Sequence, residues 1–189
     1  MASKNKLLYL FLKMRKKLID SDKFKSLSNK INEQVKKSYF FDNSKVICVY
    51  NGRNSVPLNS ILLDSKNYFK NIFVFPQLIG NKLSFFHISG PDDIVIDELG
   101  TKKIRQSCFK VDINEIDVIL VPGVAFDYTH NWLNEGDNVG LYDVILSKTD
   151  ATKLGVCFNC QVYGKNLPES KNKLDGLLTE EGVLYYFNI

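Results

Sequence analysis

The sequence contains only two histidines, and neither belongs to a recognisable catalytic pattern. His87 falls in a strand-like run, and His130 falls in a long loop. No serine or cysteine forms a nucleophile elbow that either histidine could serve as a base. The sequence therefore gives no support to hydrolysis by a catalytic triad.

Long apolar runs are also missing. No stretch approaches the ~20 apolar residues that a transmembrane helix needs. The apolar piece at residues 7–12 is shorter than the core of a secretory signal, and no small-residue cleavage site follows it. We therefore expect a cytoplasmic protein with reduced thiols and no membrane partner.

The four cysteines do not make up a metal site in the sequence. Cys157 and Cys160 have the C-x-x-C spacing of a redox pair or of half a zinc site, but Cys48 and Cys108 are isolated. A redox pair would begin a helix after a strand, whereas Cys157 is predicted inside a strand. The pattern favours buried, inert thiols.

Arginine is scarce, with three residues, although the chain carries a formal charge of +4. The positive excess lies in residues 1–40, on the polar sides of two predicted helices, with almost no aromatic or arginine residues between the lysines. This pattern favours a solvated helix face over a nucleic-acid site, and a phosphate-bearing ligand is the main alternative.

The length and composition are those of an ordinary globular protein. The chain has 189 residues, of which 44% are hydrophobic and 24% charged. These values predict a single domain over residues 1–189 with its own apolar core.

Apolar periodicity predicts strands that alternate with helices. A first helix at 4–19 and a second one capped by Ser21 or Asp22 precede any strand. The alternation predicts an α/β sandwich with a mostly parallel sheet. Strands are predicted at 46–50, 72–75 (ended by Pro76), 83–88, 116–121, 153–158, 177–178 and 183–187, and helices near 57–62 and 142–146.

The loop after Val121 is the candidate binding site. It is long and polar, and it contains Gly136 and Gly140 before a predicted helix. Glycines before a helix allow backbone N–H groups to approach an anion, and Asp143 in the first turn could hold Mg²⁺ beside phosphates. Alternatively, Asp143 only complements the helix dipole.

The segments Val121-Pro-Gly-Val-Ala-Phe-Asp127 and Gly140-Leu-Tyr-Asp143 resemble the signature of the 5-formyltetrahydrofolate cyclo-ligase family, also called 5,10-methenyltetrahydrofolate synthetases. Weaker similarities follow in the family's order along most of the chain. They are the basic first helix, Val74-Phe75-Pro76, Gly155 to Phe158 with Gln161, Leu167-Pro168 and Thr179-Glu180.

The resemblance implies a three-layer α/β/α sandwich of the ribose-phosphate isomerase and CoA-transferase type. It implies ATP-dependent closure of 5-formyltetrahydrofolate to 5,10-methenyltetrahydrofolate, and it names no catalytic side chain. The implied residues are Lys4, Gly136, Asn138 and Gly140 for ATP, Gly140, Leu141 and Tyr142 for the folate, and Asp143 for Mg²⁺.

Several positions depart from the family pattern. Leu8 and Ser55 stand where the family has Arg and Glu, the Arg of the glycine-rich loop is missing, and residues 170–173 lack the expected Asp. A catalytically impaired homologue that acts as a binding or structural protein is therefore the second hypothesis. A nucleic-acid-binding protein is the third, and the family's activity is preferred.

Overall fold

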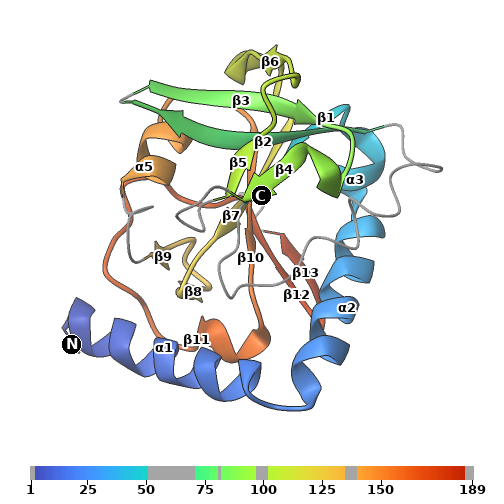
Figure 1. Ribbon diagram of the computed structural model, residues 1–189. Coiled ribbons are helices and arrows are strands. Elements are labelled where there is room, and N and C mark those ends of the chain that lie inside the picture. Colours follow the sequence, from blue (N-terminus) through green and yellow to red (C-terminus); the bar gives the residue numbers. More distant parts are fainter. Residues whose placement is uncertain (1–2, 51–70, 81, 97–101, 135–139, 186–189) are drawn as a thin grey trace.

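The computed structural model describes residues 3–50, 71–80, 82–96, 102–134 and 140–185 (Figure 1). In this part of the chain, an eight-stranded sheet has the order β13-β12-β10-β7-β1-β2-β3-β6. Its strands are β1 (Val46–Cys48), β2 (Ile72–Ile79), β3 (Lys82–Ile88), β6 (Lys110–Val111), β7 (Val118–Pro122), β10 (Thr152–Val156), β12 (Gly176–Thr179) and β13 (Gly182–Tyr185).

The middle of the sheet is parallel and its outer pairs are antiparallel. Strands β12, β10, β7, β1 and β2 pair in parallel, whereas β13, β3 and β6 join in antiparallel orientation. The prediction of an α/β fold with a mostly parallel sheet is therefore confirmed. The sequence did not distinguish the antiparallel additions, because an apolar run does not show in which direction a strand pairs.

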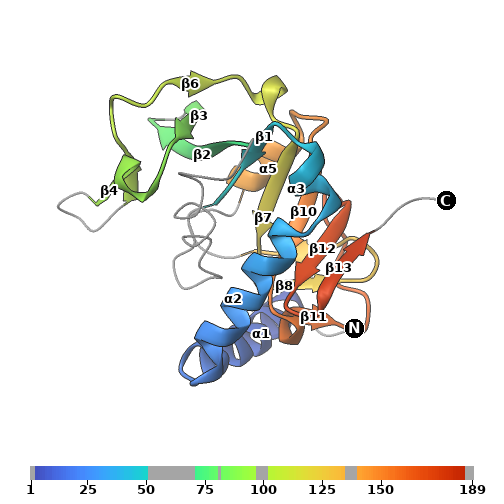
Figure 2. The same ribbon diagram turned by 90° about the vertical axis from the view of Figure 1, so that its right-hand side faces the viewer.

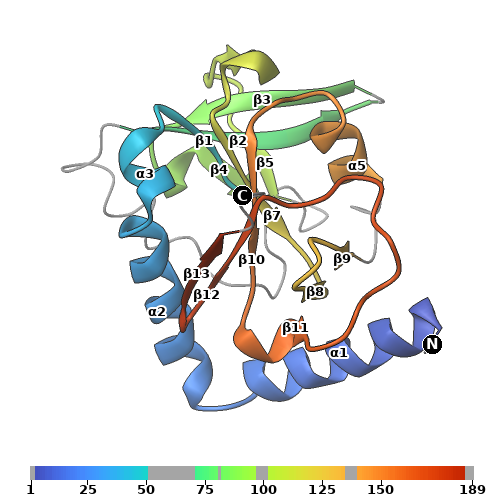
Figure 3. The same cartoon turned by 180° about the vertical axis from the view of Figure 1, so that it is seen from behind.

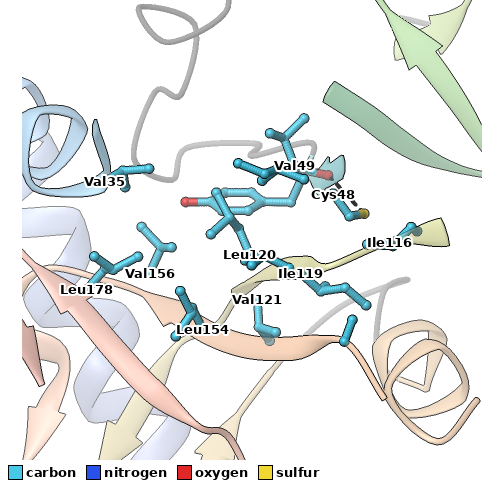
Figure 4. Packing of buried hydrophobic residues seen from close by; sticks show 14 of the residues in the cluster. Val35, Cys48, Val49, Ile116, Ile119, Leu120, Val121, Leu154, Val156 and Leu178 are labelled. Atoms are coloured by element: carbon cyan, nitrogen blue, oxygen red, sulfur yellow. Dashed lines mark hydrogen bonds between the residues drawn. The ribbon is translucent and has the colours of Figure 1, made fainter. Parts of the chain in front are cut away.

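The strands β1, β7 and β10 are buried because helices or loops cover both of their faces, as is usual for parallel strands. Val121, Leu154 and Val156 pack with Leu178 of β12 in the core, close to Val35 of a helix (Figure 4). Each of these five side chains is at most 3% exposed.

Helices lie on opposite sides of the sheet. Figures 1 and 3 show α2 (Lys23–Lys36) and α3 (Tyr39–Asn43) on one side and α5 (Leu141–Leu146) on the other. The first helix, α1 (Lys4–Ile19), runs below the end of the sheet, next to β11 (Val162–Tyr163), and it meets α2 at a sharp bend (Figure 2).

The first helix has the predicted bounds, but its apolar stripe differs from the prediction. Leu7 and Phe11 are buried, whereas Leu10 and Met14 of the predicted stripe are exposed. The predicted side-chain cap of α2 is wrong, since Asp22 makes no capping hydrogen bond and the Ser21 hydroxyl donates to Leu18 O at 2.6 Å.

The prediction that Pro76 ends a strand is also wrong, because β2 continues to Ile79. The Val74 carbonyl accepts from Val49 N at 2.9 Å and so faces β1. The backbone groups of every second residue in a strand point to the same side. The backbone nitrogen of Pro76 therefore also points to the side of β1, but it lies beyond Cys48, where β1 ends. No ladder partner in the described chain needs its missing N–H there, and proline is tolerated at such an edge.

The loop after Val121 contains secondary structure that its polar composition did not indicate. Strands β8 (Ala125–Asp127) and β9 (Trp132–Leu133) form a second sheet with β11. A further hairpin joins β4 (Ile94–Ile96) and β5 (Lys102–Ile104). The remaining short elements are the 3-10 helices η1 (Pro91–Asp93), η2 (Ile113–Glu115) and η4 (Asn159–Gln161).

Two predicted features cannot be compared with the structure. The predicted helix near 57–62 and the middle of the loop at 135–139 lie outside the described residues. Among the described helices, none combines the length and the apolar character that crossing a bilayer requires.

Candidate functional site

A cavity of about 120 Å³ lies where the start of α1, the β8–β9 hairpin, the start of α5 and the segment after β11 meet. Lys4 comes from α1, and Gly140 and Asp143 come from the beginning of α5. The structure thus brings together three residues that the resemblance assigns to ATP or Mg²⁺. The other lining residues are Trp132, Leu133, Asn134 and residues 168–171.

Lys4 is held at the cavity by the buried side of its helix. Leu7, one turn further along, is 4% exposed and packs with Val124, Ala125 and Leu133 of the β8–β9 hairpin. Residues three apart lie on the same face of a helix, so the anchoring of Leu7 also directs Lys4 toward the hairpin. Ser3 caps this helix by accepting from Lys6 N at 3.4 Å.

The segment 167–174 is tied to the hairpin by side-chain hydrogen bonds. The Ser170 hydroxyl accepts from Trp132 N at 2.9 Å and donates to Trp132 O at 3.0 Å. The Trp132 indole Nε1 donates to Asn172 O at 3.1 Å. The Asn172 amide in turn donates to the Asp143 carbonyl at 3.1 Å, and this bond connects the segment to α5.

Asp127 organises the turn of the hairpin. Its Oδ1 accepts from Thr129 N, Thr129 Oγ1 and Asn131 N at 2.8, 3.0 and 2.9 Å. Its Oδ2 accepts from Asn131 Nδ2 at 3.1 Å and from Leu167 N at 2.7 Å. Burial alone would raise the pKa of Asp127, but the bonds from Leu167, Asn131 and Thr129 outweigh it and lower the pKa.

Asn131 connects Asp127 by hydrogen bonds to Ser170, which lines the cavity. Its side-chain oxygen accepts from Ser170 N at 3.0 Å and from Lys173 Nζ. Its side-chain nitrogen donates to Asp127 Oδ2 and Thr129 Oγ1. Asn131 is 5% exposed, so its polar atoms depend on these protein partners. The residues Asp127 and Asn131 are structural members of the site for which the sequence suggested no role.

Gly140 enters α5 with φ 90°, a left-handed conformation that favours glycine. The Gly140 carbonyl accepts from Val144 N at 3.0 Å, which starts the helix, and Asp143 falls in the first turn. The structure therefore supports a conformational reason for glycine at the position that was predicted to contact ATP.

Tyr142 lies in the core, where it is 3% exposed. Burial, and then the neighbouring Cys48 and Tyr50, raise the pKa of its hydroxyl. Tyr142 belongs to the first turn of α5 and is not among the described lining residues of the cavity, and the side chain of Leu141 lies outside the described part of the structure. Their contact with folate stays a prediction, and the predicted ATP contacts Gly136 and Asn138 lie outside the described residues.

Cys157 follows β10 and precedes η4, so its predicted place inside a strand is wrong. It is fully buried and Cys160 is half-buried. Burial, followed by the charge of Glu180, raises the pKa of both thiols, which disfavours the reactive thiolate. No cluster of three or more metal-ligating side chains occurs within the described ranges.

The two histidines take part in packing and in a turn of the backbone. The His87 ring stacks on Phe109 with 4.6 Å between ring centroids. His130 occupies the tight turn of the β8–β9 hairpin with φ 71°, and its carbonyl accepts from Leu174 N at 3.1 Å. Neither residue lines the cavity.

The charges around the cavity suit a phosphate chain with a divalent cation. Lys4 and Lys171 provide positive charge, and Asp143 and Glu169 provide carboxylates. One or two carboxylates together with substrate phosphates are the usual ligands of Mg²⁺. The donor set therefore fits Mg²⁺ bound with a nucleotide, and Trp132 and Lys171 are lining residues that the sequence did not single out.

Comparison with known proteins bears on the family of the chain. The model of the "5-formyltetrahydrofolate cyclo-ligase family" matches residues 1–180. A probable 5-formyltetrahydrofolate cyclo-ligase of Schizosaccharomyces pombe is 28% identical, over 61% of this chain and 64% of the relative. The match thus spans slightly less than two thirds of that relative.

Two solved structures share the fold. An Aquifex aeolicus 5,10-methenyltetrahydrofolate synthetase has a TM-score of 0.76 and 25% identity, over 93% of this chain and 92% of its own. A Mycoplasma pneumoniae 5,10-methenyltetrahydrofolate synthetase has a TM-score of 0.69 and 22% identity, over 95% and 100%. The family match over nearly the whole chain decides the assignment, and the chain belongs to the 5-formyltetrahydrofolate cyclo-ligase family.

Proposed function

We propose that the protein catalyses the ATP-dependent conversion of 5-formyltetrahydrofolate to 5,10-methenyltetrahydrofolate, with release of ADP and phosphate. The observation that carries this proposal is the cavity in which Lys4, Gly140 and Asp143 meet, in a chain that matches the family over residues 1–180. Lys4 comes from α1, whereas Gly140 and Asp143 come from the start of α5, so the fold brings two separate segments together.

The proposed reaction has two steps. The formyl oxygen attacks the γ-phosphorus of ATP, and the bond from that phosphorus to the bridging oxygen breaks, so that ADP leaves. N10 of the folate then attacks the resulting imidate-like carbon, loses its proton and expels phosphate, which closes the ring. Phosphorylation is needed because an amide-like oxygen is otherwise a poor leaving group.

The side chains of the cavity would position the phosphates and offset their charge. Lys4 would contact a phosphate oxygen, and Gly140 allows close backbone approach because it lacks a Cβ. Asp143 and Glu169 would hold Mg²⁺, which neutralises charge on the phosphate chain. Such electrostatic positioning is the main contribution that a protein makes to phosphoryl transfer.

The experiment is to follow methenyltetrahydrofolate by its absorbance after 5-formyltetrahydrofolate, ATP and Mg²⁺ are mixed with the protein. We expect product formation by the wild type and a loss of about 10-fold or more in Asp143→Asn, because one charge-assisted contact is lost. Asp150→Asn is the matched control, since Asp150 is exposed and outside the cavity lining.

Absence of product from a folded sample, together with no ATP-dependent rise in melting temperature, would contradict the enzyme assignment. That result would support the alternative of a catalytically impaired homologue that acts as a binding or structural protein.

A further inference from the structure

Two lysines line the cavity from different elements. Lys4 belongs to α1 and Lys171 to the segment after β11, and neither has an ion pair within the described ranges. Lys173, two residues further, differs because its Nζ lies 3.6 Å from Glu169 Oε1 and donates to Asn131. Lys4 and Lys171 therefore have positive charge available for a ligand.

The backbone around Lys171 is fixed on both sides. Ser170 before it exchanges two hydrogen bonds with the backbone of Trp132. Asn172 after it accepts from the Trp132 indole and donates to the Asp143 carbonyl. Lys171 thus starts from a prearranged backbone, which reduces the entropy lost when its side chain binds an anion.

The cavity combines carboxylates with basic side chains. Asp143 and Glu169 line it, and without a bound cation their carboxylates would repel phosphate. Leu8, near Lys4 on α1, adds no charge and packs against the apolar cluster of Leu7 and Phe11. Lys4 and Lys171 are the basic side chains among the described lining residues, so both are placed to offset the phosphate charge that Mg²⁺ leaves unbalanced.

The size of the cavity indicates which part of a ligand lies there. Its volume of about 120 Å³ is well below the roughly 300–1,000 Å³ of pockets that enclose a whole ligand. A chain of phosphate groups suits this space and these charges better than a nucleoside does.

We propose that Lys4 and Lys171 form a two-lysine clamp on the phosphate chain of the nucleotide, with Lys171 as a specific phosphate ligand of this protein. This inference rests on the nucleotide of the proposed function. Lys171 contacts the phosphates directly, whereas Lys173 acts only by holding Asn131 and the segment in place.

The test is calorimetric titration of the full-length protein with tripolyphosphate and with ATP. We expect Lys171→Gln and Lys4→Gln each to weaken tripolyphosphate binding by about 10-fold or more, the usual effect of losing a charge-assisted contact. Lys171→Arg should restore most of the affinity because it keeps the charge. Lys165→Gln is the control, since Lys165 is exposed and outside the cavity lining.

Trp132 provides a second, local readout. It is the only tryptophan of the chain and lines the cavity, so its emission should change as tripolyphosphate binds. The concentration for half of this change should shift in Lys171→Gln and stay unchanged in Lys165→Gln.

The outcomes separate the clamp from the enzymatic activity. Wild-type affinity in a folded Lys171→Gln would overturn the clamp even if the enzyme is active. Absence of any tripolyphosphate and ATP binding by the wild type would overturn it as well. Binding that depends on Lys171 in a protein that forms no methenyltetrahydrofolate would support the clamp and contradict the proposed reaction.

Discussion

The amide of Leu167 donates a 2.7 Å hydrogen bond to Oδ2 of Asp127, a residue 40 positions earlier in the chain. This bond fixes the start of segment 167–174 against the β8–β9 hairpin. Since the segment supplies residues 168–171 to the cavity and the hairpin supplies Trp132 and Leu133, Asp127 shapes the site without lining it.

We expect Asp127→Asn to lower the free energy of unfolding by about 3 kcal/mol. The carboxylate accepts from Thr129, Asn131 and Leu167, and an amide nitrogen in place of one oxygen would face N–H donors. Urea unfolding followed by circular dichroism measures the change. Asp20→Asn, at an exposed helix end, is the control, and equal stability of both variants would contradict a central role for Asp127.

The same carboxylate should make stability depend on pH in the acid range. Its pKa lies below the ordinary value of 3.8 in the folded protein. Ionised Asp127 therefore stabilises the fold above about pH 4, and this contribution is lost as the pH falls through the folded pKa. We expect the difference in unfolding free energy between wild type and Asp127→Asn to shrink between pH 5 and about 2. A constant difference would contradict this prediction.

A third prediction concerns the buried ring of Phe126, which packs closely against Gly123 and Gly155. A Cβ on Gly155 would lie 2.6 Å from Leu177 Cδ2 and 2.7 Å from Phe126 Cε1, and both of those side chains are fully buried. Gly155→Ala should therefore destabilise the protein by about 1–3 kcal/mol, as overpacked cores do. The melting temperature measures the effect.

Gly164→Ala is the matched control for Gly155→Ala. A Cβ there would have no heavy atom within 4 Å, and the residue does not have a positive φ. We expect a change within about 0.5 kcal/mol. If both variants melted at the same temperature, the core around Phe126 would be able to adapt to the extra methyl group.

A fourth prediction concerns the thiols. Cys48 and Cys157 are buried, and burial raises the pKa of each, so Ellman's reagent should not reach them in the folded protein. Cys108 and Cys160 are half-buried and should react slowly. All four should react in urea, and rapid reaction of Cys157 without denaturant would contradict the structure.

The sequence predicted the features that depend on local patterns. The bounds of α1 follow from its apolar spacing, and the buried strand β7, which ends at Pro122, follows from a continuous apolar run. Short motifs that follow one another in the family's order along the chain were enough to identify the family. These signals are contained in neighbouring residues, so a single sequence reveals them.

The features that were missed depend on distant residues. Pro76 continues a strand because β1 ends at Cys48, which no local pattern around Pro76 indicates. The role of Asp127 depends on Leu167, and the place of Lys171 depends on Trp132 and Asn172. Tertiary contacts decide such cases, and spacing in the sequence does not contain them.

The final prediction tests Gly140 at the entrance of α5. Its φ of 90° disfavours any residue with a Cβ, although a Cβ would have no heavy atom within 4 Å. Gly140→Ala should thus lower the free energy of unfolding by about 1–2 kcal/mol through backbone strain, or shift the backbone.

Gly80→Ala is the matched control, since Gly80 at the β2–β3 turn has φ 58° and a Cβ there would also have no heavy atom within 4 Å. Both variants should lose stability in denaturant titrations, but only Gly140→Ala should also weaken ATP binding in calorimetry, because Gly140 lines the cavity with Lys4 and Asp143. Equal ATP affinity in the two variants would show that the conformation of Gly140 does not matter to the nucleotide.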